Sequence, residues 1–451
     1  CAILKIGMKC HLFMHPFLLF DNEAGDAAAL TLGLPSCLYM LYRNKVYGII
    51  SLLLTICALF HTDSRTAWLT SSFVASYWIK QCALSKLKIR WFHSLIIGIV
   101  ALVFIWFLWL LRPDSVLGRL YIDKITLDLI MKSPLHGLGC SGFHREYMNA
   151  QACYFSQHVK TSNFTQLADN IPHAFNELFS WIVCYGFIGL VLLIVFIVQW
   201  TLPAIYVYRF KNYRSHIGFV RLVYIKSMAI ALIGLSMASY PFCYPYIILV
   251  SLSILLFIPR GTIVLSRLKR IGVFILGFFI FFAAVSMALG EFYWKKADVA
   301  GIRGNISVAE YNYERAIALL PAYPVVIYNY AADLNAAQCY ERSQQVCERL
   351  SLYLNDYDTE FLKADNAYGL QDYSQSIRHF ELASLMVPCR FYPRWRLFCL
   401  YRLQNNYLIC KDFAIEIIKK PVKVSSNEIK QMKTEVLEWL KVNNGNTLNN
   451  K

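Results

Sequence analysis

The feature that most constrains this chain is a series of long apolar runs separated by polar gaps. A helix needs about 20 largely apolar residues to cross a lipid bilayer. Only 16% of the 451 residues are charged and 57% are hydrophobic, whereas soluble domains carry about 25% charged residues. The sequence therefore predicts an all-α, polytopic bundle of about eight transmembrane helices: Ala27–Leu41, Val46–Phe60, Ala67–Ile79, Phe92–Leu111, Phe179–Tyr208, Ile217–Met237, Phe242–Ile258 and Ile271–Leu289.

Lysine and arginine in the gaps predict the orientation of these spans. Basic residues accumulate in cytoplasmic loops of membrane proteins. Every second gap is basic here, and the short gaps between them hold almost no lysine. The basic gaps contain Arg43 and Lys45; Lys80, Lys86, Lys88 and Arg90; Arg209, Lys211 and Arg214; and Arg260, Arg267, Lys269 and Arg270. This alternation predicts that the long 112–178 loop and everything after Leu289 face away from the cytoplasm.

The same pattern divides the chain into parts. It opens with Cys1 and not with methionine, so we expect further residues before it. Residues 1–26 are then an outward-facing segment or the remnant of a missing span. The other parts are spans one to four at 27–111, an extracytoplasmic loop at 112–178, spans five to eight at 179–290, a helical domain at 296–441 and a tail at 442–451.

The helical domain contains an internal similarity. Tyr313-Glu-Arg-Ala-Ile-Ala-Leu-Leu-Pro321 resembles Phe380-Glu-Leu-Ala-Ser-Leu-Met-Val-Pro388, and Cys347-Glu-Arg-Leu-Ser-Leu-Tyr-Leu-Asn355 lies between them. The spacing is close to the ~34-residue period of tetratricopeptide repeats. The pattern predicts a tetratricopeptide-like α-solenoid, with an ordinary helical bundle as the alternative. The Asn-rich tail after it is expected to be disordered.

Charge and cysteine content narrow the functional classes. The net charge of +16 lies in short tracts between apolar runs, and no RNA-binding signature or phosphate-binding loop is present. We therefore expect no nucleic-acid partner. No carboxylate pair or histidine cluster has metal-ligand spacing, so no metal and no cofactor are expected. Cys140 and Cys153 share the long loop and could form a disulfide if that loop is extracytoplasmic.

Three segments, in order, carry polar residues at or near the outer ends of spans. They are Ser64-Arg65-Thr-Ala; Gly118-Arg119 with the later Ser-Pro-Leu-His136-Gly137-Leu-Gly139; and His173-Ala-Phe-Asn176-Glu177-Leu, followed by Gly186-Phe-Ile-Gly189-Leu. Together with Phe20–Gly25, they resemble motifs of the bacterial O-antigen ligase and polymerase superfamily, which includes O-linked oligosaccharyltransferases. The resemblance covers roughly Phe20 to Phe196. Several family members carry a tetratricopeptide tail.

The resemblance implies a transferase in the bacterial inner membrane. Its donor would be a glycan on a polyprenyl pyrophosphate, such as undecaprenyl pyrophosphate, and its acceptor a hydroxyl on the periplasmic side. Arg65 and Arg119 would bind the pyrophosphate, because guanidinium forks bind phosphate oxygens bidentately. His173 would be the general base, since its pKa lies near operating pH. Gly137, Gly139 and Asn176 would shape the loop.

Two departures from the family pattern concern the base. The family's histidine stands directly before asparagine, whereas Phe175 precedes Asn176 here. Glu177 is therefore an alternative base. Cys184 stands where many members carry a carboxylate, and His136, in a turn, is expected to be structural.

Alternatives remain open at this point. The acceptor distinguishes a ligase acting on lipid A core, a polymerase extending the glycan and an oligosaccharyltransferase acting on protein. From other classes, a lipid or solute transporter or a non-catalytic membrane scaffold would also fit a polytopic chain. Expected partners are the lipid-linked donor, the acceptor, membrane lipids and a protein bound by the repeat tail.

Overall fold

The computed structural model describes residues 23–62, 64–82, 113–158, 164–210, 216–257, 267–321 and 323–448. Within these ranges the chain consists of helices joined by turns, without a β-strand, which confirms the all-α prediction there. The span predicted at Phe92–Leu111 lies outside the described residues, as does most of 1–26. The chain divides into two compact units. We call them the bundle unit (Cys1–Asp123, Ser133–Gly137 and His173–Ile263) and the tail unit (Lys124–Lys132, Leu138–Pro172 and Val264–Lys451).

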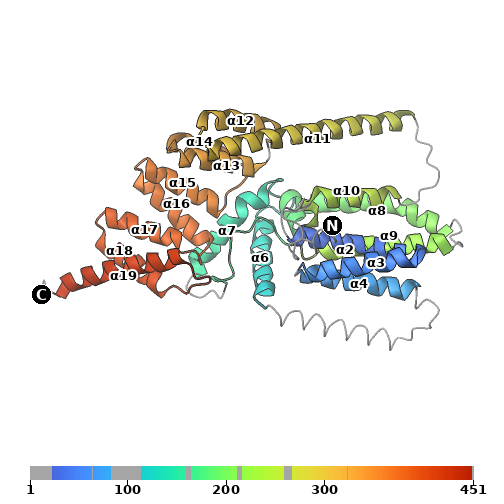
Figure 1. Cartoon of the computed structure of the whole chain (residues 1–451), viewed down its shortest axis with the longest axis horizontal. Coiled ribbons are helices and arrows are strands. Elements are labelled where there is room, and N and C mark those ends of the chain that lie inside the picture. The colour runs from blue at the N-terminus through green and yellow to red at the C-terminus, as the bar shows by residue number, and fades with distance from the viewer. Residues whose placement is uncertain are drawn as a thin grey trace. The chain divides into compact units, whose positions relative to one another are not determined.

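The bundle unit is built around helices that lie side by side in Figure 1. Its helices are α2 (Glu23–Arg43), α3 (Lys45–Phe60), α4 (Arg65–Cys82), the first part of α6 (Pro113–Lys132), α8 (Glu177–Phe210), α9 (His216–Ser236), the short 3-10 helix η1 (Pro241–Cys243) and α10 (Pro245–Phe257). Leu34, Val74, Val223 and Leu235 share one buried apolar core. A Cβ at Gly234 of α9 would lie 2.8 Å from Thr70 Cγ2 of α4. The missing side chain therefore lets these two helices approach closely.

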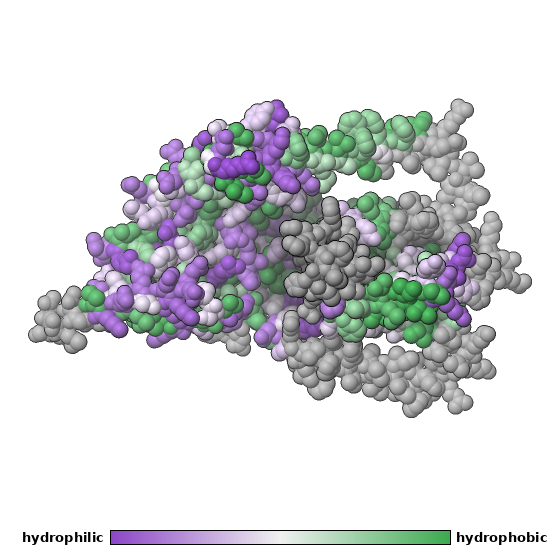
Figure 2. All heavy atoms as spheres, in the orientation of Figure 1, coloured by the Kyte–Doolittle hydropathy of each residue, from purple (hydrophilic) through white to green (hydrophobic). Residues whose placement is uncertain are grey.

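Four helices of the described chain are long and apolar enough to cross a membrane: Ala24–Arg43, Glu177–Gln199, Phe219–Ser236 and Gly277–Ile302. Each overlaps a span predicted from the sequence. Lys45–Phe60 is a shorter apolar helix, and much of its outer side is hydrophobic in Figure 2. Helices of this length and composition indicate an integral membrane protein. The total of eight spans stays a prediction.

The C-terminal part of the tail unit begins with α11 (Arg267–Ile302) and continues as a series of shorter helices. They are α12 (Ile306–Leu319), α13 (Pro324–Ala336), α14 (Tyr340–Leu350), α15 (Tyr357–Gly369), α16 (Tyr373–Met386), α17 (Tyr392–Leu403), α18 (Tyr407–Lys419) and α19 (Asn427–Leu448). Helix α19 continues to Leu448, into the segment for which the sequence predicts disorder. The boundaries drawn from the sequence stay predictions.

The turns within the successive helix pairs of the tail unit repeat one geometry. Residues Gly304, Gln338, Gln371 and Asn405 all have positive φ, between 56° and 73°. They are 34, 33 and 34 positions apart. In each turn this residue donates its N–H to the carbonyl three residues earlier, and the next residue donates to the carbonyl five residues earlier. Such left-handed caps satisfy the last carbonyls of a helix. The period equals the one seen in the sequence.

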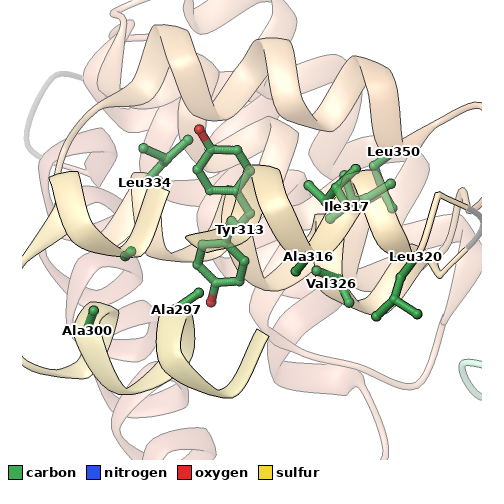
Figure 3. Close-up of a cluster of buried hydrophobic side chains, with 12 residues drawn as sticks. Ala297, Ala300, Tyr313, Ala316, Ile317, Leu320, Val326, Leu334 and Leu350 are labelled. Atoms are coloured by element: carbon green, nitrogen blue, oxygen red, sulfur yellow. The ribbon is translucent and has the colours of Figure 1, made fainter. Parts of the chain in front are cut away.

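The first two helix pairs share a core that Figure 3 shows in close-up. Tyr313 is fully buried among Ala297, Ala316 and Leu334. Its ring stacks on Tyr330 with centroids 5.1 Å apart, and its hydroxyl donates to Asp333 Oδ2 at 2.9 Å. The small residues of α11 leave room for the large aromatic ring, as close packing of a core requires.

The part of the long loop from Leu138 to Pro172 belongs to the tail unit. Its helix α7 (Gly142–His158) packs on α16. The buried Gln151 amide donates to the Met386 carbonyl at 2.5 Å and to the Asp169 carbonyl at 3.1 Å. Asn170 Nδ2 donates to Asp356 at 3.1 Å and to Asp358 at 2.9 Å. The loop therefore contains two parts, of which one is a structural component of the helical tail.

Candidate functional site

The two candidate arginines lie in the bundle unit, on α4 and α6. Arg65 is the first residue of α4, and Arg119 lies in the second turn of α6. Arg119 Nη1 donates to the Thr66 hydroxyl at 3.0 Å. That hydroxyl in turn donates to the Ala238 carbonyl at 3.4 Å, beyond the end of α9. One threonine thus fixes the guanidinium of Arg119 to two other elements.

The charges of the two arginines act on each other. Burial lowers the pKa of Arg119, and the positive charge of Arg65 lowers it further, while Asp123 and Tyr240 oppose the shift. Burial also raises the pKa of Asp123, against the effect of Arg119. Two positively charged guanidinium groups that lie close enough to repel each other are stabilised when a doubly charged anion binds between or beside them. This part of the bundle unit is therefore suited to a phosphate or pyrophosphate group.

Aromatic rings border Arg119. The centre of its guanidinium lies 5.4 Å from the centroid of the Phe175 ring, within the range of a cation–π interaction. Phe175 packs edge-on against Tyr240 at 5.3 Å. Phe175 has φ of +35°, a backbone conformation that costs energy for a bulky residue. The strained backbone lets the Phe175 ring meet Arg119 and Tyr240 from a segment that also holds His173.

His173 lies on the same aromatic cluster. Its ring centroid is 4.4 Å from that of Tyr240, and its Nδ1 lies 3.6 Å from Cys243 Sγ. Tyr240 directly precedes η1, and Cys243 is the last residue of η1, which follows α9. His173, Phe175 and Tyr240 form one cluster in the bundle unit, and Phe175 and Tyr240 both interact with Arg119. The structure therefore brings His173 and Arg119 to one site.

Asn176 and Glu177 begin α8, and their side chains make structural contacts. Asn176 Oδ1 accepts from the backbone N–H groups of Leu178 at 3.1 Å and Phe179 at 3.3 Å, as an N-capping residue does. Glu177 Oε1 accepts from the Phe242 N–H at 2.8 Å. One oxygen of Glu177 thus anchors η1, the element that carries the sulfur next to His173.

The glycine-containing turn of the loop meets α8 at a kink. Gly186 has φ of +66° inside α8, and the kink leaves two N–H groups outside the helical pattern. Phe187 N–H donates to the Pro134 carbonyl at 2.8 Å, and Ile188 N–H donates to the Leu135 carbonyl at 3.2 Å. A Cβ at Gly137 would lie 2.5 Å from the Cys184 carbonyl. The two glycine-containing motifs therefore form one backbone-to-backbone contact.

Four other loop residues have different surroundings. His136 is exposed. Gly139 has φ of +86° with open space around it, and it belongs to the tail unit. Cys140 and Cys153, also in the tail unit, are both exposed thiols and are not joined to each other. Among the described residues there is no group of three or more His, Cys, Asp or Glu side chains placed to hold a metal ion.

Sequence reasoning did not select Thr66, Phe175, Tyr240 or Cys243 as site residues. Thr66 follows Arg65 directly, and Phe175 lies within the third motif, so their positions were visible. Tyr240 and Cys243 lie more than 60 residues after His173, at the end of another span. The sequence holds no local signal for their place in the site.

Comparison with known proteins finds a match that covers part of this site. Residues 50–194 match the model of a protein family described as O-antigen ligase. The chain is similar to that family over less than half of its length, in a range that includes Arg65, Arg119, His173 and Glu177. The match suggests a membrane glycan transferase of the O-antigen ligase or polymerase kind. A search of the curated proteins finds no match.

Proposed function

We propose that this protein transfers a glycan from a polyprenyl pyrophosphate to a hydroxyl acceptor at the outer surface of a bacterial inner membrane. One observation carries the proposal: Arg119, within electrostatic reach of Arg65, shares an aromatic cluster with His173. A cationic group for the leaving pyrophosphate and a base for the acceptor are the two requirements of this displacement.

The arginines would act on the donor. A pyrophosphate ester is a good leaving group only when the charge that develops on it is stabilised, and fixed cations in a water-poor site do this without reorganising. The hydrogen bond from Arg119 to Thr66 and the Phe175 ring limit the movement of the guanidinium. Arg65, at the start of α4, would supply the second positive charge.

His173 would act on the acceptor. When Nδ1 donates to the Cys243 sulfur, Nε2 carries the lone pair and is able to accept a proton. The acceptor oxygen would attack the anomeric carbon as the bond from that carbon to the pyrophosphate oxygen breaks. The proton would pass to His173, and the bonding electron pair would leave with the pyrophosphate. Glu177 is the weaker choice for the base, because one of its oxygens holds η1.

The periodic turns of the tail unit support the proposal that it is a tetratricopeptide-like solenoid. Such arrays commonly bind other proteins. The basic gaps between spans, together with the family resemblance, support a periplasmic location for the site and the tail. A protein acceptor or partner would then bind on that side.

The test uses the full-length protein in detergent with a polyprenyl-pyrophosphate oligosaccharide and a mixed pool of lipid A core, glycan and protein acceptors. Release of polyprenyl pyrophosphate and the mass of the product are measured for the wild type and Arg119→Ala. Arg221→Ala, which removes an exposed arginine of α9, is the matched control. We expect Arg119→Ala to lose about 10²–10³-fold in turnover, as removal of one charge-stabilising group does.

The product identifies the acceptor class. A mass increase on lipid A core indicates a ligase, a longer glycan indicates a polymerase, and a modified protein indicates an oligosaccharyltransferase. Donor binding without release would contradict the proposal and favour a transporter. Failure to bind the donor would favour a scaffold.

A further inference from the structure

A second cationic site lies in the tail unit, where the apolar part of α11 ends. The candidate span Gly277–Ile302 contains, in its C-terminal half, the consecutive aromatic residues Phe292, Tyr293 and Trp294, and Lys295 and Lys296 follow them at once. Aromatic residues and lysines in this order are typical of the level at which a helix leaves the hydrocarbon core. In Figure 2 the colour along α11 changes from hydrophobic to hydrophilic toward α12.

A groove opens at this level between α11 and α12. It has a volume of about 710 Å³, within the range of ordinary small-molecule sites, about 300–1,000 Å³. Its lining includes Phe292, Lys295, Lys296, Val299 and Arg303, and it contains no acidic residue. Spacings of three and four residues place these side chains on one face of α11.

Apolar side chains lie exposed beside the cations. Phe292 is 53% exposed, Val308 46% and Tyr311 57%. All three line the groove. The ammonium of Lys296 lies 4.5 Å from the centroid of the Phe292 ring. Exposed aromatic and aliphatic groups together with lysines make a surface that suits the boundary between headgroups and acyl chains.

No carboxylate in the described part of the chain forms an ion pair with the groove cations, whereas the acidic residues of α12 are paired elsewhere. Glu310 forms an ion pair with Arg342, and Glu314 pairs with Arg349 at 3.6 Å. Lys295, Lys296 and Arg303 form no ion pair with any residue that the structure describes. The acidic side chains thus face α14, and the positive charge of the groove is left for another group.

We infer that this groove binds the phosphate headgroups of anionic phospholipids in the membrane that α11 enters. The positive charge of the groove complements a negatively charged phosphate. The exposed apolar side chains of Phe292, Val308 and Tyr311 favour a lipid, which has acyl chains, over a soluble anion. Binding would hold the first helix pair of the tail unit at the surface of the bilayer. It would involve neither Arg65 nor Arg119, and so it does not depend on the proposed transferase activity.

The experiment measures retained lipid by native mass spectrometry of the full-length protein, delipidated in a non-ionic detergent. Phosphatidylglycerol is compared with phosphatidylcholine of the same chain length. The test variant is Lys295→Gln/Lys296→Gln/Arg303→Gln. The matched control, Lys419→Gln/Lys430→Gln/Lys441→Gln, removes three exposed lysines of α18 and α19. Thermal unfolding verifies that both variants are folded.

We expect the wild type and the control to prefer phosphatidylglycerol and the test variant to bind it on the order of 100-fold more weakly, because each interfacial cation contributes about a fivefold effect. Equal binding by the test variant and the wild type would overturn the inference, as would equal binding of the two lipids. Competition by glycerol phosphate as strong as by the intact lipid would assign the groove to soluble phosphates. Groove-dependent binding of polyprenyl pyrophosphate alone would assign it to the donor.

Discussion

The bundle unit and the tail unit are both helical, but different kinds of contact position their important residues. In the tail unit, four turns with the same hydrogen bonds recur 33 or 34 residues apart. In the bundle unit, each site contact occurs once and joins distant segments: Arg119 to Thr66, 53 residues apart, and His173 to Cys243, 70 residues apart. A repeated local geometry leaves a signal in the sequence, whereas a single long-range contact leaves none.

The comparison is tested most strongly at His173, whose contact with Cys243 joins residues 70 positions apart. We expect His173→Ala to reduce turnover by about 10²–10⁴-fold, the usual contribution of a general base, with little effect on donor binding. Glu177→Gln keeps an oxygen that can accept from the Phe242 N–H and should retain most of the activity. Turnover and donor affinity are measured separately for both variants. A larger loss in Glu177→Gln would move the base to Glu177.

Gly186→Val tests the backbone contacts between the loop turn and α8. Its Cβ would collide with the Leu135 carbonyl, and valine disfavours positive φ. The free energy of unfolding should fall by about 3 kcal/mol or more, as measured by thermal unfolding in detergent. Gly277→Val, with nothing within 4 Å of its Cβ, is the control. Equal stability of the two variants would show that the close approach at the kink does not hold in solution.

Gln151→Leu tests whether the loop helix α7 is part of the tail unit. The variant would leave the carbonyls of the buried Met386 and the partly buried Asp169 without their amide donor. We expect a loss of about 1–3 kcal/mol in the free energy of unfolding, and faster hydrogen exchange in both α7 and α16. Exposed Gln157→Leu at the end of α7 serves as the control. Faster exchange confined to α7 would argue that the loop does not stabilise the helical tail.

Lys420 should produce the smallest effect, and one that depends on pH. Burial, with Arg394 nearby, lowers the pKa of Lys420 to about 7, and its ammonium donates to the Arg390 carbonyl at 2.6 Å. Between pH 7 and the unfolded-state pKa of about 10.4, the unfolded chain binds more protons. Stability should therefore rise with pH across this window.

Lys420→Met should remove most of that pH dependence. Thermal unfolding of the wild type and the variant at several pH values measures it, with Lys419→Met as the exposed neighbouring control. A slope that persists unchanged in Lys420→Met would assign the titration to another group.

Much of the fold could be predicted because its signals are local. Apolar length identified the helices that overlap the four candidate spans, and the Tyr313 and Phe380 motifs indicated the period of the tail. The sequence places the last span within 179–290 and the helical domain at 296–441. In the structure one helix, α11, runs continuously from Arg267 to Ile302 across this boundary.

The candidate site was only partly visible. Arg65, Arg119 and His173 follow from motifs, but Tyr240 and Cys243 enter the site only because α9 returns the chain to that place. The sequence predicts residues 112–178 to form a single polar loop. In the structure, Ser133–Gly137 packs on the kink of α8, while Leu138–Pro172 belongs to the tail unit. Such a division depends on which partner supplies carbonyls and amides, and no pattern within the loop encodes it.

The sequence by itself determined the helical class, the helices that overlap the four candidate spans and the period of the tail, because apolar length and capping are properties of one continuous stretch of chain. The tertiary structure alone decided that a threonine, a strained phenylalanine and a tyrosine from three different segments surround Arg119. Hydrogen bonds and ring contacts of this kind depend on the distance between atoms in space, and chain separation does not predict that distance until the helices have packed.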